Sequence, residues 1–514
     1  MKKVYGILLF LSLIFWSSCR KDFDTLPSSG NLSFSKDTVY LDTVFTQTAS
    51  STYRLTVYNR SKEDIHIPEI KLAQGEASKY RLNVDGLPGK KFSNIPIYAK
   101  DSIFVFIETT AAIKDFTNSA TQFLYTDELI FSGTEKEQSV ELVTLIQDAH
   151  FLYPEKFADG STETLSFGFD DEGNEILISG FLLDDTELNF TNEKPYVIYG
   201  YAAVPPQKTL HIDAGARLHF HQQSGILVGN QASLQAKGLL STDLEKMENE
   251  IIMEGNRLEP QFSEVPGQWG ALWFTQGSTN NIIEHTTIKN SSVAIRVDGN
   301  DGSNTPTLKV NNTQIYNVSN IGLLARTGYV TAENLVINNC GQMALNLSLG
   351  GNYQFNNCTF ANYWRQGFRQ FPAVFIENVL ETPNQLFLAP LEKADFTNCI
   401  IYGNESRELL FNAHPDADFN FKFENTLIKF RDFQNKYTDD PMYNFTDSNL
   451  YTQIKLNEDP DFKDSTLNKL QIGEESAANG LANPVTSSNI DILGMQRDGN
   501  LPDSGAYESS SFTD

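Results

Sequence analysis

Basic residues are few in this chain. Its 514 residues include 39 Lys and Arg against 65 Asp and Glu, which gives a formal net charge of -26. This excess of carboxylates repels phosphate backbones and anionic lipid, so we expect neither a nucleic-acid partner nor membrane attachment through a basic face. Apolar residues are plentiful, because 40% of the chain is hydrophobic and 12% aromatic. That content excludes a disordered acidic chain.

Cysteine is rare as well. The chain has 4 cysteines, and Cys340, Cys358 and Cys399 form no CxxC pair and have no histidine close by in sequence. A metal site or an activated nucleophile needs such neighbours. We therefore predict that these three are small buried hydrophobic side chains, and their odd number leaves at least one free thiol.

Long hydrophobic runs are absent, and the longest uncharged apolar stretch is the 13 residues from Val4 to Trp16. It is too short to span a bilayer, but it follows two lysines and precedes small residues, as in a secretory signal. With Cys19 at its end, the segment resembles bacterial lipoprotein signals. The alternative is an ordinary signal peptide, since Trp16 stands where lipoprotein signals usually carry an aliphatic residue.

The lipoprotein resemblance implies an arrangement at the membrane. Residues 1–18 would be removed, Cys19 would carry the lipid, and residues 19–31 would form a polar tether. The partner at this end would be the membrane, reached through the lipid on Cys19, and the location would be the cell outer membrane. The side of that membrane stays undetermined.

From 32 to 150 the sequence alternates apolar and polar residues in short runs, separated by turn-rich breaks. Period two indicates strands, and about seven strands in this length are typical of an immunoglobulin-like sandwich. No residue in it suggests chemistry. We interpret it as a spacer or docking module.

A repeat follows. The segments EHTTIKN, NNTQIYN, ENLVINN, NNCTFAN, TNCIIYG and ENTLIKF, which begin at 284, 311, 333, 356, 397 and 424, share one register. Their second column is His285, Asn312, Asn334, Asn357, Asn398 and Asn425, and their fifth is Ile288, Ile315, Ile337, Phe360, Ile401 and Ile428. The steps between them are 27, 22, 23, 41 and 27 residues. A rung needs about 22 residues, so we expect the 41-residue step to hold one further rung around AVFIEN at 373–378. Such spacing predicts a parallel β-helix over 165–450, with the fifth column pointing inward.

The five asparagines of the second column are predicted to be structural. Asparagine tolerates the left-handed backbone of a turn, and stacked amides can hydrogen-bond along the solenoid axis. The alternative is a polar row that binds a ligand.

The repeat resembles the right-handed parallel β-helix superfamily, which includes pectate lyases and related polysaccharide-active enzymes. More closely, GQWGALWF at 267–274 and FANYWRQGFRQFPAVFIEN at 360–378 are similar to segments of β-helix surface lipoproteins of Bacteroidota. Residues 451–514 resemble the C-terminal capping segment of secreted bacterial β-helix proteins, with SAANG at 476–480 in place of the usual SPAID-like step. The expected fold class is all-β: a sandwich, then a right-handed parallel β-helix with a C-terminal cap.

Residues suited to catalysis are few. Arg296 and Arg326 fall at comparable points of successive rungs, where a lyase would place its base. Asp298 and Asp301 lie in DGNDGSN at 298–304, which resembles a calcium loop only loosely because Lys309 occupies the closing position. We interpret this segment as a surface turn and expect no cofactor. The alternative is that it binds calcium. His219 and His221 alternate along one strand and are predicted to form an outward polar pair.

The insertion NYWRQGFRQF, which begins at Asn362, crowds aromatic and basic side chains together. Flat rings beside guanidinium groups bind sugar rings and their acidic substituents. The candidate glycan-binding residues are Tyr363, Trp364, Arg365 and Arg369, with Phe368 and Phe371 beside them. The alternative is that the aromatics pack on the solenoid while the arginines pair with carboxylates.

These observations predict a lipid-anchored envelope protein that acts as a binding or structural module for polysaccharide or another envelope protein. No catalytic constellation is visible. The alternative is a polysaccharide lyase or glycoside hydrolase that works in the groove of the β-helix. An enzyme of that kind requires several carboxylates, or carboxylates with a Lys or Arg, on neighbouring rungs.

Overall fold

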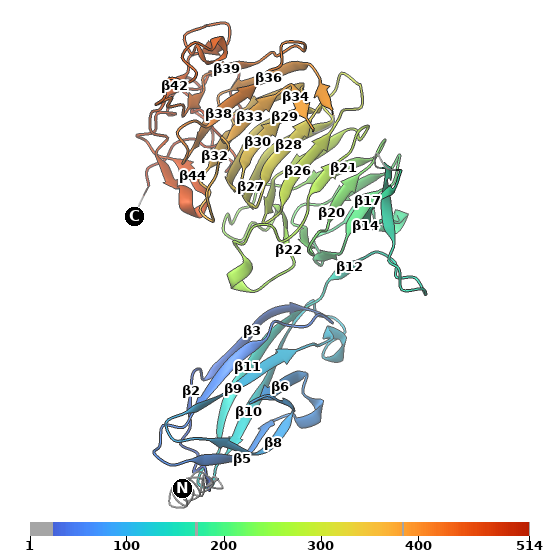
Figure 1. The fold of residues 1–514 in the computed structure, drawn as a ribbon, viewed down its shortest axis with the longest axis vertical. Helices are drawn as coiled ribbons and strands as arrows, with labels where there is room; N and C mark the ends of the chain where they lie inside the picture. Colours follow the sequence, from blue (N-terminus) through green and yellow to red (C-terminus); the bar gives the residue numbers. More distant parts are fainter. Residues whose placement is uncertain (1–23, 170–172, 383–384, 513–514) are drawn as a thin grey trace, which may run out of the picture. The chain divides into compact units, whose positions relative to one another are not determined.

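The computed structural model describes residues 24–169, 173–382 and 385–512, and it is all-β, as predicted. The chain divides into two compact units at Asp148 and Ala149 (Figure 1). The predicted signal peptide and Cys19 lie outside the described residues. Among the described residues, no helix has the length and apolar character needed to cross a membrane. Their helical residues are short 3-10 turns: η1 (Gly75–Ala77), η2 (Ile113–Asp115), η3 (Asp185–Glu187), η4 (Pro260–Phe262), η5 (Pro441–Tyr443) and η6 (Ser465–Leu467).

The first unit is a sandwich of two sheets. One sheet contains β1 (Leu26–Pro27), β5 (Ile65–Leu72), β8 (Lys91–Ile97), β10 (Gln122–Ser132), β11 (Gln138–Gln147) and β3 (Thr38–Phe45). The other contains β2 (Ser33–Phe34), β4 (Tyr53–Tyr58), β9 (Ser102–Thr109), β6 (Tyr80–Val84) and β7 (Leu87–Gly89). Alternate residues are buried in the long strands β9, β10 and β11, for example Val140, Leu142 and Ile146 of β11, because successive side chains point to opposite faces.

The predicted tether is shorter than expected. Leu26 and Pro27 pair in parallel with Ile65 and His66 of β5, and the amide of Ser28 donates to the carbonyl of His66 at 2.8 Å. The chain therefore joins the sandwich sheet from Leu26 onward. The prediction of a free tether up to residue 31 is wrong for these residues, because an unpaired edge of β5 accepts them as a strand.

The second unit is a parallel β-helix whose rungs stack through the green-to-orange part of Figure 1. One face is a 10-stranded sheet of β13 (Thr164–Phe169), β14 (Glu175–Leu182), β17 (Tyr201–Val204), β20 (Gly225–Val228), β23 (Leu272–Phe274), β26 (Val293–Asp298), β28 (Ile321–Arg326), β30 (Met343–Leu347), β33 (Val374–Glu377) and β38 (Leu409–Asn412). Apart from the antiparallel hairpin β13–β14, its strands are parallel.

Most of the other strands form a 19-stranded sheet that is bent into two further faces, while β34 (Val379–Glu381) and β35 (Leu386–Leu388) form a separate hairpin. The first face, called the groove face below, contains β15 (Asn189–Phe190), β18 (Thr209–Ile212), β21 (Ser233–Lys237), β24 (Asn281–Glu284), the first halves of β27 (Leu308–Val318) and β29 (Tyr329–Cys340), β31 (Gly351–Asn356), β36 (Leu391–Thr397), β39 (Lys422–Glu424) and β41 (Tyr451–Thr452). The second face contains β12 (His150–Leu152), β16 (Tyr196–Ile198), β19 (Arg217–Phe220), β22 (Ile251–Gly255), β25 (Thr286–Lys289), the second halves of β27 and β29, β32 (Thr359–Asn362), β37 (Ile400–Gly403), β40 (Leu427–Ile428) and β42 (Lys455–Leu456).

The bend between these two faces lies at the repeated second column. The column residues His285, Asn312, Asn334, Asn357, Asn398 and Asn425 all have left-handed backbone, with φ from 43° to 55°. The predicted inward column, from Ile288 to Ile428, is completely buried in the solenoid core. The cysteines Cys340, Cys358 and Cys399 are buried there too, which confirms their prediction as small core residues.

The C-terminal segment has two roles. Its first strands, β41 and β42, pair with β39 and β40 and so cover the strand edges of the preceding rung. The rest, residues 457–512, runs back along the side of the solenoid over the bend and the second face, and we call it the strap. It includes β43 (Phe462–Asp464) and β44 (Lys469–Ile472). Strap residues Leu470, Ile492 and Tyr507 are buried against Val336 and Ala361.

Candidate functional site

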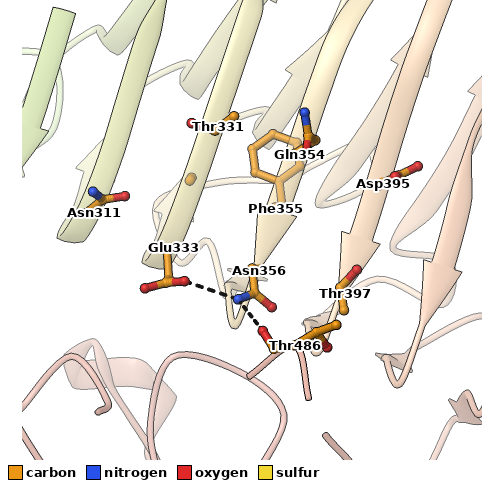
Figure 2. A pocket seen from close by; sticks show the side chains of 10 residues that line it. Asn311, Thr331, Glu333, Gln354, Phe355, Asn356, Asp395, Thr397 and Thr486 are labelled. Carbon is orange, nitrogen blue, oxygen red and sulfur yellow. Dashed lines mark hydrogen bonds between the residues drawn. The ribbon is translucent and has the colours of Figure 1, made fainter. Parts of the chain in front are cut away.

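A polar groove crosses the groove face over β27, β29, β31 and β36 (Figure 2). Two rows of side chains in strict register line it. The first row is Asn311, Glu333, Asn356 and Thr397, and the second contains Thr331, Gln354 and Asp395. The alternate residues Val310, Ala332 and Phe396 are buried in the core, so both rows point outward. The volume of the groove is about 390 Å³, and Thr486 of the strap forms part of its rim.

The groove offers hydrogen-bonding groups of both kinds. The Asn356 amide donates to Glu333 at 3.2 Å and to the Thr486 carbonyl at 2.9 Å, which attaches the strap to the sheet. Gln354 and Thr331 stand beside them in neighbouring strands (Figure 2). Amides present donors and acceptors together, and hydroxyls do the same. The groove is therefore suited to a ligand rich in hydroxyl groups.

The two carboxylates of the groove are not placed as a hydrolytic pair. Glu333 lies on β29 and Asp395 on β36, with β31 between them and two residues of offset along the strands. Strand spacing puts their backbones about 12 Å apart. Asp395 also forms an ion pair with Lys393 at 3.1 Å. The arrangement can bind hydroxyls but lacks the geometry of acid–base hydrolysis.

A second depression of about 420 Å³ lies on the 10-stranded sheet and includes Arg296, Asp298 and Arg326. Asp298 and Arg326 are register partners on β26 and β28, whereas Arg296 is paired with Leu324. One oxygen of Asp298 accepts from the Trp273 indole at 2.8 Å and from Arg296 Nε at 2.7 Å. The Arg326 guanidinium is 3.6 Å from the other oxygen. The structure thus brings Arg296, Asp298 and Arg326 together. The two arginines were expected at comparable points of successive rungs, but they are offset by two residues along the strands.

The Trp273 ring in this depression has neighbours on its faces. Phe167 stacks on it with 4.5 Å between centroids, and the Arg296 guanidinium lies 4.0 Å from the ring centre. Phe167 and Arg296 therefore take up part of the ring surface that a sugar could stack on.

The Asp301 carboxylate hydrogen-bonds to nearby residues of the protein. Its oxygens accept from the Thr279 hydroxyl at 2.6 Å and the Ser303 amide at 2.9 Å. Burial favours a higher pKa for Asp301, but these hydrogen bonds outweigh burial and lower the pKa. Within the described ranges no group of three or more His, Cys, Asp or Glu is placed to hold a metal ion. Asp298 and Asp301 each have local protein partners.

The prediction that Arg369 contacts a glycan is wrong. Its side chain is 1% exposed and pairs with Glu408, which is 0% exposed, at 2.6 Å. The guanidinium also donates to the carbonyls of Asn362 and Phe371 and to the Asn404 side chain. A buried carboxylate on the next rung neutralises the arginine, and this contact between distant segments is not visible in the sequence.

The other candidates of the insertion are separated from one another. Tyr363 packs on Phe462 of the strap with 6.1 Å between ring centroids, and burial raises its pKa. Trp364 is half-buried, and its carbonyl accepts from Asn404 at 3.1 Å. Arg365 is exposed, and Phe368 is fully exposed at the end of the insertion. The insertion therefore does not present the four predicted residues as one site.

The prediction for the histidine pair is wrong for His219. His221 is exposed, but His219 is 6% exposed on the second face, where later segments of the chain cover it. Its Nδ1 lies 3.7 Å from Glu254, which also forms an ion pair with Lys289 at 2.9 Å. Burial lowers the pKa of His219, although the carboxylate of Glu254 opposes that shift.

The asparagine column makes two kinds of contact. Asn334 donates to Asn312 at 2.9 Å along the axis, which is the predicted ladder contact. Asn312 makes a second contact of this kind with His285 at 3.3 Å. The remaining members have other partners: Asn357 donates to the carbonyl of Asp503, Asn398 to Asn356 and Thr486, and Asn425 to the carbonyl of Leu481. Most of the column therefore binds the strap, a role that the sequence repeat alone did not reveal.

Comparison with known proteins is uninformative about function. No family model and no curated protein matches the chain. Solved structures that resemble part of it include a family 123 glycoside hydrolase from Clostridium perfringens, at 8% identity over 24% of this chain. This chain spans only 30% of the length of that enzyme. Another is a PapD-like domain of human CEP192, which is 9% identical over 24% of this chain and 89% of that one. A third is the periplasmic chaperone SfaE, which is 12% identical over 29% of this chain and 82% of that one. All three have a TM-score of 0.16, which is too low to support an argument.

Proposed function

We propose that this chain is a lipid-anchored protein of the bacterial cell envelope whose β-helix binds glycan in the groove between β27 and β36. It would belong with the β-helix surface lipoproteins of Bacteroidota that its repeat and insertion resemble. The observation that carries the proposal is the double row of amides, hydroxyls and carboxylates in register on a flat parallel sheet.

The groove is suited to a sugar chain for two reasons. Its polar side chains repeat at the strand spacing of about 4.8 Å, so successive hydroxyls of an extended ligand meet successive donors and acceptors. Its sheet is held from behind by the solenoid core and at the rim by the strap, so little ordering is needed on binding.

A second candidate function is a polysaccharide lyase acting at the depression around Arg296, Asp298 and Arg326. It is favoured by one observation, the convergence of two guanidinium groups and a carboxylate on neighbouring strands. A lyase needs a basic residue to remove a proton and positive charge to stabilise the resulting anion.

The test is a glycan array with the purified full chain in detergent, followed by titration of each bound glycan against variants. Gln354→Ala should weaken binding about tenfold, which corresponds to the loss of roughly 1.4 kcal/mol from one hydrogen bond to the ligand. The matched control is Lys237→Gln, an exposed outward residue of β21 on the same face, which should leave affinity unchanged.

Each outcome separates the candidates. Binding without turnover, lost in Gln354→Ala, supports the groove. Release of unsaturated sugar that disappears in Arg296→Lys would instead establish the lyase. If the chain binds no glycan on the array, the glycan proposal is overturned.

A further inference from the structure

Cys358 and Cys399 lie side by side in the core. Asn356 pairs with Thr397, and Thr359 pairs with Ile400, so the register between these flanking pairs places the two cysteines opposite each other on successive rungs. Both side chains are completely buried.

The two cysteines belong to a column with a shared contact. At the equivalent position of other rungs, the hydroxyls of Thr286, Thr313 and Thr426 donate to the carbonyl two residues earlier at 2.8–3.0 Å. The thiols of Cys358 and Cys399 make the same contact, each at 3.2 Å, with the carbonyls of Asn356 and Thr397. Leu335 occupies the same column on the rung after Thr313. The column therefore accepts threonine as well as apolar side chains, and cysteine is not required for packing.

The geometry is compatible with a covalent bond. Parallel strands lie about 4.8 Å apart, so the Cα atoms of in-register residues fall inside the range of about 4.4–6.8 Å that disulfides occupy. Their Cβ atoms need to approach from about 4.8 Å to about 3.5–4.5 Å, so the two strands must draw together locally by up to about 1 Å. Only weak thiol contacts with the carbonyls of Asn356, Ala332, Thr397 and Phe355 are lost when the sulfurs join.

We propose that Cys358 and Cys399 form a disulfide when the chain folds in an oxidising medium. One thiolate attacks a sulfur of an external disulfide such as oxidised glutathione and releases one glutathione thiolate. The second cysteine then attacks the mixed disulfide and releases the other glutathione thiolate, so two protein thiols are oxidised and one glutathione disulfide is reduced. The bond links two rungs across the 41-residue step that contains the insertion.

The bond forms as the chain folds and not afterwards. Burial raises the pKa of the Cys358 thiol, with the neighbouring Cys399 acting in the same direction, and the folded core excludes the oxidant. Thiolate is the reacting species, so exchange inside the finished core is slow. The inference requires only an oxidising medium and does not depend on glycan binding; the proposed envelope location would supply such a medium.

Cys340 is an internal control. It is as deeply buried as the other two, and burial raises its pKa to about 12, but its thiol faces the carbonyl of its own neighbour Asn338 at 3.7 Å. It should stay reduced under conditions that join the other two.

The test is refolding of the full chain from urea in a glutathione redox buffer, followed by alkylation in denaturant and peptide mass mapping. We expect a linked pair of peptides containing Cys358 and Cys399, an alkylated Cys340, and a Tm several degrees above that of the same chain refolded in dithiothreitol. Alkylation of both Cys358 and Cys399 would overturn the proposal, as would a bond to Cys340.

Threonine variants make the test independent of folding defects. Cys358→Thr and Cys399→Thr each keep the hydrogen bond that this column makes. Both should refold with the Tm of the reduced wild type and show no rise in Tm in the redox buffer. A rise in either variant equal to that of the wild type would contradict the assignment.

Discussion

At the scale of single residues, the repeated asparagines of the second column have two roles. They form the turn between two faces of the solenoid, and most of them also hydrogen-bond to the strap. Each member adopts a left-handed backbone that costs most residues roughly 1–2 kcal/mol, and asparagine tolerates it best among residues with a side chain. The side chain then binds across the bend. The turn and the strap are thus stabilised by the same residues.

Asn398 provides a test of this dual role. It is completely buried at φ 55°, donates to Asn356 at 3.1 Å and accepts from the Asn483 amide at 2.8 Å. Asn398→Ala should lower the free energy of unfolding by roughly 3 kcal/mol, since it loses these hydrogen bonds and strains the backbone.

The matched variant is Asn398→Gly, which removes the same hydrogen bonds without backbone strain. It should be more stable than the alanine variant by roughly 1 kcal/mol in urea unfolding. Equal stability of the two would show that the left-handed backbone contributes nothing at this position.

His219 makes stability depend on pH. Burial lowers its pKa below the ordinary 6.5, against the opposing effect of Glu254. The unfolded chain therefore binds a proton at His219 before the folded chain does. The stability from the neutral buried imidazole is complete above about pH 6.5 and is lost as the pH falls below it, by at most about 1.4 kcal/mol per pH unit.

Urea unfolding of His219→Gln from pH 7 to pH 5 measures this contribution. The slope of unfolding free energy against pH should be smaller than in the wild type. His285, whose pKa burial also lowers, acts in the same window, so His285→Asn should reduce the slope further. An unchanged slope in the double variant would contradict the role of both.

At the scale of elements, the strap is held by a buried arginine. Arg497 donates to the carbonyls of Asp503 at 3.0 Å and Gly505 at 2.9 Å, and to the side chain of Asn334 at 3.1 Å. Desolvation lowers its pKa, although Glu508, Asp491 and Asp503 oppose that shift. The Arg497 side chain therefore holds two segments of the strap together and also binds the strap to Asn334 at the bend.

Arg497→Met should loosen the strap while the rungs remain folded. It leaves buried carbonyls and acidic groups without their donor, at a cost of roughly 3–5 kcal/mol. We expect faster limited proteolysis within residues 481–512 and an unchanged far-ultraviolet spectrum. Arg407→Met, which removes a partly exposed pair with Asp432, is the control and should not alter the cleavage rate. Loss of the β spectrum in Arg497→Met would show that the strap is needed for the rungs themselves.

At the scale of the whole molecule, the charge of -26 belongs to a body with two separate cores. Carboxylates dominate the surface, so membrane attachment through protein charge is unfavourable and the proposed lipid on Cys19 must supply it. Multiple acyl chains would suffice for stable anchoring.

Cys19→Ala should therefore move the protein from the membrane fraction to the soluble fraction of the envelope. Incorporation of labelled fatty acid into the wild type, and its loss in the variant, measures the attachment directly. Cys340→Thr changes a buried thiol and should leave the distribution as it is. Membrane-bound Cys19→Ala would count against lipid anchoring at this residue.

The 41-residue step is a single rung, because Asn356 pairs directly with Thr397, so the expectation of a further rung there is wrong. The sequence by itself determined the strands, the inward column and the left-handed asparagines. These depend on local periodicity and backbone preference, which each segment carries alone. Only the tertiary structure decided that Arg369 is buried against Glu408, that His219 is covered, and that the strap binds the bend. Those contacts join segments tens to more than a hundred residues apart. Their energy depends on burial and charge pairing, and both exist only after the chain has folded.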